Sequence, residues 1–454
     1  MTRDGRRLVR DASFSLDSGS IIIVLGESGS GKSLLAQAVM GNLPADLTCR
    51  GRVRLMGEEV SELNGYARRA LWGRRIGMLP QEPWIALNPL MRADAQVAEV
   101  HALVRGSKWQ EARSQALAAL RRLGLGGVER RLPFRLSGGM AQRVALAATE
   151  AGGTPILIAD EPTKGLDADR REDVAALLRA QADAGAAVMV ITHDIGLAER
   201  LGGNMLVMLE AEIVERGATA TVLSAPQHSY TRRLLAADPA RWPPAARAAS
   251  GIDEGEDVLV AADLTKCLGG CVLFDGLDLR IRVGRIAAAT GPSGCGKTTL
   301  GNMLLGLIDP DGGRVSRAKA APHRFQKIWQ DPVAAFAPSA TLGAALDDVA
   351  HRHRLDAEVA KTLLARMRID PGLLVRLPSQ VSGGELQRIA LARALMVDPV
   401  FLFADEATSR LDPVTQREVM ELLRDSVAER GLAMLMVTHD QDLAHSIADQ
   451  VLRM

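Results

Sequence analysis

A glycine-rich turn joins an apolar segment to a helix-like segment twice in this chain. The first turn, GESGSGKS at residues 26–33, follows the apolar residues 21–25 and precedes residues 34–40, which have a helical pattern. The second turn, GPSGCGKT, spans residues 291–298. Glycines let successive backbone N–H groups point at one anion, and the helix that follows adds the positive end of its dipole. A strand, this turn and a helix therefore predict one phosphate-binding loop in each half of the chain.

Six groups of residues recur in the same order in both halves, which indicates an internal duplication. They are the lysine of each turn, a glutamine, a Ser-Gly-Gly sequence, an acidic pair after an apolar run, a Leu-Asp pair and a Thr-His-Asp triplet. They start at Lys32, Gln81, Ser137, Asp160, Leu166 and Thr192 in the first half, and at Lys297, Gln330, Ser382, Asp405, Leu411 and Thr438 in the second. Each group alone has an ordinary explanation as a turn, a helix cap or a strand end. Their shared order, found twice, is what indicates a functional site.

The spacing of apolar residues predicts an α/β fold. Short segments rich in Ile, Val and Leu alternate with Ala- and Leu-rich helical segments such as residues 110–122 and 171–184, and this alternation predicts a parallel sheet with helices on both faces. The residues between each glutamine and the next Ser-Gly-Gly sequence have a helical pattern and predict a separate helical lobe. The first half carries extra residues around positions 46–65.

A junction rich in proline and alanine, followed by a Gly/Asp/Glu run, separates the halves. We therefore predict a first domain at residues 1–236, a linker at 237–256 and a second domain at 257–454.

Composition argues against several classes of function. The 55 basic and 54 acidic residues give a net charge of +1, which disfavours nucleic-acid binding by bulk electrostatics. Aromatic residues make up 3% of the chain, too few for platforms that stack single strands. The four scattered cysteines suit a reducing cytosol. No apolar run approaches the roughly 20 residues that span a bilayer, and the first residues begin no signal peptide. We expect any membrane role to come through a partner.

With these motifs, the chain resembles a fused pair of ATP-binding-cassette (ABC) ATPase domains over nearly its whole length. The Ser-Gly-Gly sequence with its following Gln-Arg is highly specific for that family. The resemblance implies two tandem P-loop NTPase domains, each with a RecA-like core and a helical lobe. In this family two cassettes pack head to tail, and each ATP lies between the phosphate loop of one and the Ser-Gly-Gly sequence of the other. Lys32 would then share one ATP with Ser382, and Lys297 would share the other with Ser137.

The resemblance also implies the residues that bind ATP and Mg²⁺, the two expected cofactors. The implied nucleotide contacts in the first half are Gly26, Gly29, Ser30, Gly31, Lys32, Ser33, Gln81, Ser137, Gly138, Gly139 and Asp160. Those in the second half are Gly291, Gly294, Cys295, Gly296, Lys297, Thr298, Thr299, Gln330, Ser382, Gly383, Gly384 and Asp405. Among them, the implied Mg²⁺ contacts are Ser33, Gln81, Asp160, Thr298, Gln330 and Asp405.

The implied catalytic residues follow the two aspartates. Phosphoryl transfer to water needs positioning and charge neutralisation more than covalent chemistry. Glu161 and Glu406 would act as general bases on the attacking water, and His193 and His439 would contact the γ-phosphate and hold the bases. Both halves keep the base and the histidine, so the sequence predicts two competent sites.

Two local segments narrow the branch of the family. Residues 81–89 (QEPWIALNP) resemble the segment after the glutamine in importers of peptides and nickel. Residues 226–235 (PQHSYTRRLL) resemble the His-Pro-Tyr-Thr tail of the same importers, with Ser229 in place of the proline. The resemblance implies the ATP-hydrolysing subunit of an importer of peptides, nickel or a metal chelate carried by a metallophore. Its implied partners are two integral membrane permease subunits and, indirectly, a solute-binding protein, with no nucleic acid. The resemblance places this chain itself at the cytoplasmic face of the inner (plasma) membrane, as a peripheral subunit.

The chain departs from the family pattern near the expected adenine. The family usually stacks adenine on an aromatic residue upstream of the phosphate loop. That place falls near Cys267 and Leu268 in the second half and near Thr2 or Arg3 in the first, so neither half has the ring. The strand corresponding to residues 258–264 has no counterpart in the first half.

Three other functions stay open from the sequence alone. A soluble translation-factor ATPase also fuses two cassettes. In that class a long, charged helical linker joins the pair, and the protein binds ribosomal RNA. The ATPases of a carbon–phosphorus lyase complex look much like the peptide-importer branch, and gene neighbours would separate them. An exporter ATPase would have no obvious use for the segment around Tyr230.

Overall fold

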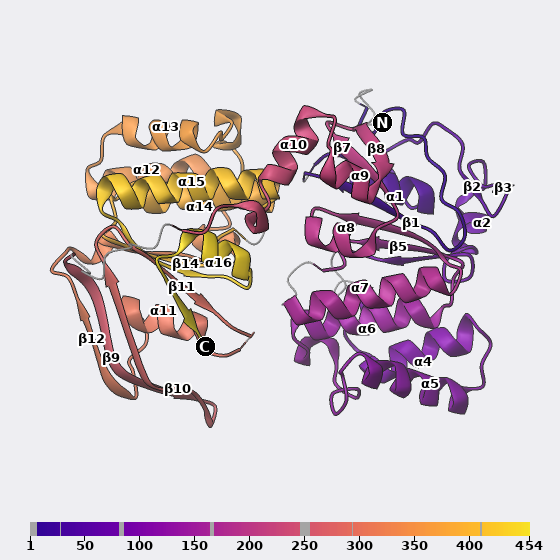
Figure 1. The fold of residues 1–454 in the computed structure, drawn as a ribbon, viewed down its shortest axis with the longest axis horizontal. Helices are drawn as coiled ribbons and strands as arrows, with labels where there is room; N and C mark the ends of the chain where they lie inside the picture. The colour runs from indigo at the N-terminus through magenta and orange to yellow at the C-terminus, as the bar shows by residue number, and fades with distance from the viewer. Residues whose placement is uncertain are drawn as a thin grey trace. The chain divides into compact units, whose positions relative to one another are not determined.

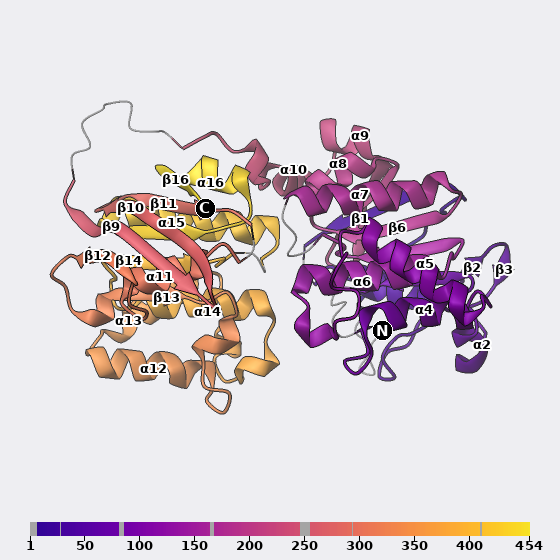
Figure 2. The same cartoon turned by 90° about the horizontal axis from the view of Figure 1, so that it is seen from below.

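The computed structural model describes residues 7–27, 29–80, 86–163, 168–245, 255–292, 294–408 and 411–454. The chain divides into two compact units, Met1–Leu235 and Ala236–Met454. Figures 1 and 2 show each unit as a sheet with helices packed around it. We describe each unit by itself.

The first unit is built on a six-stranded sheet in the order β4-β5-β6-β1-β7-β8. All neighbours in it are parallel except β7 and β8, which are antiparallel. Its strands are β1 (Ile21–Gly26), β4 (Ile76–Leu79), β5 (Ile156–Asp160), β6 (Ala187–Thr192), β7 (Asn204–Leu209) and β8 (Glu212–Ala218), and β2 (Arg54–Leu55) and β3 (Glu58–Glu59) pair separately. Its helices are α1 (Lys32–Met40), α2 (Gly65–Arg69), α4 (Ala93–Leu103), α5 (Trp109–Arg122), η1 (Pro133–Arg135), α6 (Gly138–Ala151), α7 (Ala168–Asp183), α8 (Ile195–Leu201), α9 (Thr219–Ser224) and α10 (Ser229–Ala236).

The second unit has a parallel five-stranded sheet in the order β13-β14-β15-β11-β16 and an antiparallel three-stranded sheet in the order β10-β9-β12. Its strands are β9 (Asp257–Leu268), β10 (Cys271–Arg282), β11 (Ile286–Thr290), β12 (Gly312–Arg317), β13 (Phe325–Ile328), β14 (Phe401–Asp405), β15 (Ala433–Val437) and β16 (Gln450–Arg453). Its helices are η2 (Pro239–Arg241), α11 (Lys297–Leu305), η3 (Pro322–Arg324), η4 (Pro332–Ala335), α12 (Leu342–His353), α13 (Ala357–Arg366), η5 (Pro371–Leu373), η6 (Pro378–Gln380), α14 (Gly383–Leu395), α15 (Pro413–Arg430) and α16 (Gln441–Ile447).

The predicted α/β fold with a helical lobe is confirmed in both units. The central strands β1 and β6 consist of mostly β-branched residues, all apolar except Thr192, that are buried along their whole length, as expected for strands covered on both faces. In the lobe of the first unit, Ala112, Ala116 and Leu120 recur every four residues of α5 and are fully buried, which gives that helix its packing face. In the second unit, α12 and α13 lie on the other side of the five-stranded sheet from β9, β10 and β12 (Figures 1 and 2).

The two cores fill the same contact with different residues. In the second unit a Cβ on Gly301 of α11 would lie 2.0 Å from the ring of Phe403 on β14, so only glycine fits there. In the first unit the matching positions are Ala36 and Ile158, which are both fully buried. A larger helix residue is thus matched by a smaller strand residue, and close packing is kept.

Residues 239–245, which follow the first unit, pack against other residues of the second unit. In the second unit, η2 packs against α16, and the Ala245 backbone N–H donates to the His445 carbonyl at 3.1 Å. The domain boundaries that composition predicts remain predictions.

Residues 7–20 form no strand, so the described part of the first unit has no counterpart of β9 and β10. No helix in the described ranges is long and apolar enough to cross a membrane.

Candidate functional site

Each predicted phosphate loop closes around its lysine in the same way. The Lys32 ammonium donates to the carbonyls of Gly26 and Glu27, both at 2.7 Å. The Lys297 ammonium donates to the carbonyls of Gly291 and Pro292, both at 2.8 Å. Both lysines are 6% exposed. The cation that should meet the β- and γ-phosphates is therefore held inside the loop in both units.

The last glycine of each loop is required by its backbone conformation. Gly31 and Gly296 immediately precede α1 and α11 and have φ angles of 98° and 103°. L-residues with a side chain rarely adopt this left-handed conformation. A Cβ on Gly31 would also lie 2.8 Å from the Leu8 carbonyl oxygen. The loop turns sharply into the helix at this residue, so that the helix N-terminus faces the loop.

A buried aspartate ends a parallel strand that lies two positions from the loop-bearing strand in each sheet. Asp160 ends β5 and Asp405 ends β14, and each is 3% exposed. In the second unit the Thr298 hydroxyl donates to Asp405 Oδ1 at 3.0 Å. A hydroxyl beside a carboxylate is a set of hard oxygen donors, which suits Mg²⁺ when phosphate oxygens complete the shell. No group of three or more His, Cys, Asp or Glu side chains in the described ranges could hold a metal by itself.

The two predicted general bases share one strained backbone conformation. Glu161 and Glu406 have φ angles of 51° and 49°, in the left-handed region that side chains disfavour. Their backbone N–H groups donate to the carbonyls of Ile191 at 2.8 Å and Val437 at 3.1 Å. These bonds fix each glutamate just past the end of its strand. The same unfavourable φ at the same position in both units is what the predicted role of this residue in the site would explain.

A histidine holds each predicted base. His193 Nδ1 lies 2.8 Å from Glu161 Oε1, and His439 Nε2 lies 2.8 Å from Glu406 Oε1. In the second unit the Gln330 side-chain amide donates to Glu406 Oε2 at 2.9 Å. The structure thus brings the predicted glutamine, base and histidine of the second unit together. Gln81, the matching glutamine of the first unit, lies outside the described residues.

The environment of Glu406 favours its ionised form. Burial by itself would raise the pKa of this carboxyl, but the hydrogen bond and charge of His439 oppose that effect. Lys297 and the Gln330 amide also lower it, and the net pKa of Glu406 falls below its usual value. Hydrogen bonds and positive charge both stabilise a carboxylate. The side chain is therefore ready to accept a proton at neutral pH.

Ser137 and Ser382 each begin a helix. Ser137 Oγ accepts from the Met140 N–H at 3.3 Å and caps α6, and Ser382 Oγ accepts from the Glu385 N–H at 3.3 Å and caps α14. Gly138, Gly139, Gly383 and Gly384 form the first turns of these helices. Backbone N–H groups at such a helix start suit an anion. The sharing of each ATP between a loop and the serine of the other half stays a prediction.

Two contacts of the site were not predicted from the sequence. The Glu27 N–H of the first phosphate loop donates to the hydroxyl of Tyr230 on α10 at 2.9 Å, and Tyr230 is 4% exposed. The Tyr230 segment, recognised only as an importer-like tail, therefore holds the loop. In the second unit Lys327 on β13 lies 3.7 Å from Asp405 Oδ2. Its only sequence signal is a charge inside a strand where the first half has Met78.

Burial dominates the ionisation of the Lys327–Asp405 pair. It raises the pKa of Asp405 and lowers the pKa of Lys327, and the attraction between the two charges opposes both shifts without cancelling them. The Lys327 side chain is 7% exposed and that of Asp405 is 5% exposed.

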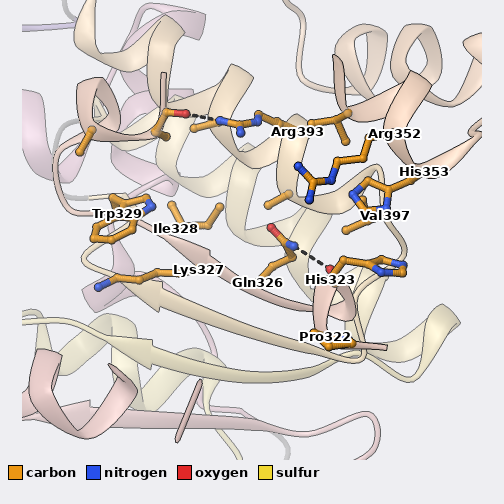
Figure 3. Close-up of a pocket in the computed structure, with 15 residues that line it drawn as sticks. Pro322, His323, Gln326, Lys327, Ile328, Trp329, Arg352, His353, Arg393 and Val397 are labelled. Carbon is orange, nitrogen blue, oxygen red and sulfur yellow. Dashed lines mark hydrogen bonds between the residues drawn. The ribbon is translucent and has the colours of Figure 1, made fainter. Parts of the chain in front are cut away.

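A cavity of about 650 Å³ lies in the second unit beside the strand that leads to Gln330. Strand β13 forms one side of it and the lobe helices α12 and α14 contribute others (Figure 3). Basic side chains are prominent in its lining: His323, Lys327, Arg352, His353 and Arg393. None of the described phosphate-loop residues of the second unit lines it. The cavity lies at the boundary between core and lobe, and its lining residue Lys327 also contacts Asp405.

A phosphate loop after a central parallel strand, with a buried aspartate and a histidine-held glutamate at the end of a second parallel strand of the same sheet, defines a P-loop NTPase. The model of the family described as ABC transporter matches residues 9–164 and 274–409. The chain belongs to this family and carries two copies of its ATP-binding domain. It is an ATPase.

Relatives of known name match nearly the whole chain. The peptidoglycan transport ATP-binding protein YejF of Agrobacterium fabrum is 35% identical, over 98% of this chain and 87% of its own length. The glutathione import ATP-binding protein GsiA of Escherichia coli K12 is 32% identical, over 98% of this chain and 81% of its own length. Among solved structures, the RNase-L inhibitor matches with a TM-score of 0.69 and 21% identity, over 97% of this chain and 84% of that one. At that identity the likeness shows the fold alone.

Proposed function

We propose that this chain is the ATP-hydrolysing subunit of an ABC importer that takes up peptides or small peptide-derived solutes. One observation carries the proposal: relatives named for peptidoglycan transport and glutathione import match 98% of the chain at 32–35% identity, over 81–87% of their own length. The importer-like segment around Tyr230 supports it, because Tyr230 contacts the first phosphate loop. Nickel or a metallophore chelate remains a second class of cargo.

ATP would be held by the loops and by the serine-led helix starts. Lys32 and Lys297 would release their loop carbonyls and turn to the β- and γ-phosphates, which are the stronger acceptors. Ser382 with Gly383 and Gly384 would meet the ATP on Lys32, and Ser137 with its glycines would meet the ATP on Lys297. These donors suit a triphosphate because each set begins a helix.

Hydrolysis would rely on the glutamate and histidine that follow each aspartate. Ser33 and Asp160 in the first unit, with Thr298 and Asp405 in the second, would hold Mg²⁺, which when bound neutralises charge on the phosphate oxygens. Glu161 and Glu406 would take the proton of the attacking water. His193 and His439 would orient these bases, as their 2.8 Å contacts support.

We propose that the chain lies at the cytoplasmic face of the inner membrane and that its partners there are two permease subunits that span the membrane. The chain has no described helix that could cross a membrane, and an importer needs a path for its cargo. The basic cavity supports a partner contact, because its lining includes Trp329, and the next residue, Gln330, touches the base Glu406. A permease segment seated there would be coupled to the hydrolytic group through one side chain.

Copurification tests the proposal directly. A tagged chain expressed in its own cells at native level should bring down two integral membrane proteins and no ribosomal subunits when detergent-solubilised membranes are used. Capture of ribosomal subunits would favour the translation-factor function. Capture of a phosphonate-processing complex without integral membrane proteins would favour the carbon–phosphorus lyase function. Either result would contradict the importer.

A further inference from the structure

A buried lysine stands beside the predicted magnesium carboxylate of the second unit, and an apolar residue takes its place in the first. Lys327 on β13 is in register with Phe403, two residues before Asp405 on β14. Met78 on β4 has the same position, because it is in register with Ile158, two residues before Asp160 on β5. The duplication therefore offers two matched sites that differ by one charge at this position.

The Lys327 ammonium is enclosed by groups that favour a cation. Its Nζ lies 3.7 Å from Asp405 Oδ2 and donates to Asn302 Oδ1 on α11 at 2.8 Å. It also lies 4.2 Å from the ring centre of Trp329 and 5.2 Å from that of Phe403, within the range of cation–π attraction. Figure 3 shows Lys327 beside Trp329. A charge at this depth is weakly screened by solvent.

In the first unit an apolar side chain, that of Met78, takes the place of the Lys327 ammonium. Met78 packs against the core cluster that contains Leu35 and Ile158. Gln37, which matches Asn302, has a buried Oε1 without a hydrogen-bond partner in the described part of the chain. The Asn302 side-chain oxygen accepts a hydrogen bond from Lys327, whereas the Met78 side chain has no hydrogen-bond donor. Met78 also brings no charge to Asp160.

We infer that Lys327 sets the divalent-ion affinity of the second nucleotide site and lowers it below that of the first. The inference rests on the proposed function, in which Asp405 and Asp160 help to hold the ion that accompanies ATP. A fixed ammonium already balances part of the Asp405 charge and repels a second cation that approaches the same carboxylate. The two sites of this chain therefore fill with metal at different concentrations, and the first site fills before the second.

A titration with Mn²⁺ tests the inference without relying on activity. Mn²⁺ serves as the spectroscopic probe, and its binding to the full chain is followed by electron paramagnetic resonance in the presence of the non-hydrolysable nucleotide AMP-PNP. We expect two classes of Mn²⁺ site whose affinities differ at least about fivefold. This is the effect expected of one unit charge near a divalent ion even when the charge is screened as strongly as in water. Equal affinities in the wild-type chain would overturn the inference.

Three variants assign the difference to the lysine. Lys327→Met gives the second site the residue of the first and should bring the two classes together. Lys327→Arg keeps the charge and should keep the difference. Met78→Lys adds a charge to the first site and should weaken the tight class. A weak class that Lys327→Met leaves unchanged, or a tight class that Met78→Lys leaves unchanged, would contradict the inference.

Two controls separate the possible failures. Thermal unfolding without nucleotide shows whether each variant is folded. If Lys327→Met does not fold, the Mn²⁺ affinity of the tighter site in the Met78→Lys chain alone tests the role of Lys327. The complete lack of nucleotide-dependent Mn²⁺ binding in the wild-type chain would overturn the proposed function rather than the role of Lys327.

Discussion

Replacing both predicted bases by glutamine should stop hydrolysis and leave nucleotide binding intact. Glutamine has the size of glutamate, and its side-chain oxygen can still meet His193 or His439, so the strained backbone at φ 51° and 49° keeps its support. The groups that would grip the phosphates, Lys32 and Lys297, are untouched. Glu161→Gln with Glu406→Gln therefore removes proton acceptance and, in the second unit, the acceptor for the Gln330 amide.

The expected loss follows from the role of a positioned base. Such a base contributes about 10²- to 10⁴-fold to the rate, which corresponds to roughly 2.7–5.5 kcal/mol in the activation free energy. The pKa of Glu406 lies below its usual value, so the carboxylate is fully available at neutral pH and its removal should cost the whole factor. Each single variant should retain ATP in its own site and slow turnover, because both sites are predicted to be competent.

Steady-state phosphate release and retention of radiolabelled ATP measure the two effects separately. The matched control is Glu421→Gln, an exposed glutamate on α15 that pairs only with Arg417 among the described residues, and it should leave both unchanged. A double variant that keeps more than about a tenth of the wild-type rate would refute the assignment of the bases, since a base is expected to supply at least about 10²-fold.

Two further predictions concern the loops and the lobe. Lys32→Ala and Lys297→Ala should each lower ATP turnover by weakening phosphate binding, as measured by phosphate release; no change in either variant would show that the loops are misassigned. Burial lowers the pKa of His101, so the unfolded chain takes up a proton first, near pH 6.5, and stability should fall as the pH drops below that value, by at most about 1.4 kcal/mol per pH unit. His101→Gln should flatten the pH dependence of thermal unfolding, and an equally steep profile in the variant would contradict this.

Local motifs made much of this molecule predictable. The phosphate loops, the aspartate–glutamate pairs and the serine-led helices are each encoded within about ten residues, and their repetition in one order identified the α/β fold with its helical lobes. A parallel sheet then brings the carboxyl ends of its strands to one edge, so the convergence of Asp405 and Glu406 on the loop followed from topology.

Contacts between distant segments could not be predicted from the sequence. Tyr230 meets Glu27 across 203 positions, and no local pattern reports which residue a tail helix will touch. Lys327 reaches Asp405 because β13 pairs with β14 in one particular register. A shift by one residue would turn the lysine to the other face of the sheet. Such registers depend on packing of the whole core, as the exchange of Gly301 and Phe403 for Ala36 and Ile158 illustrates.

The central claim is that each ATP is shared between the phosphate loop of one half and the serine-led helix of the other. A structure of the Glu161→Gln, Glu406→Gln chain with bound ATP measures this directly. We expect Ser382 Oγ within about 3 Å of a phosphate oxygen of the nucleotide on Lys32, and Ser137 Oγ equally close to the nucleotide on Lys297. A nucleotide whose phosphates contact only residues of its own half would contradict the claim.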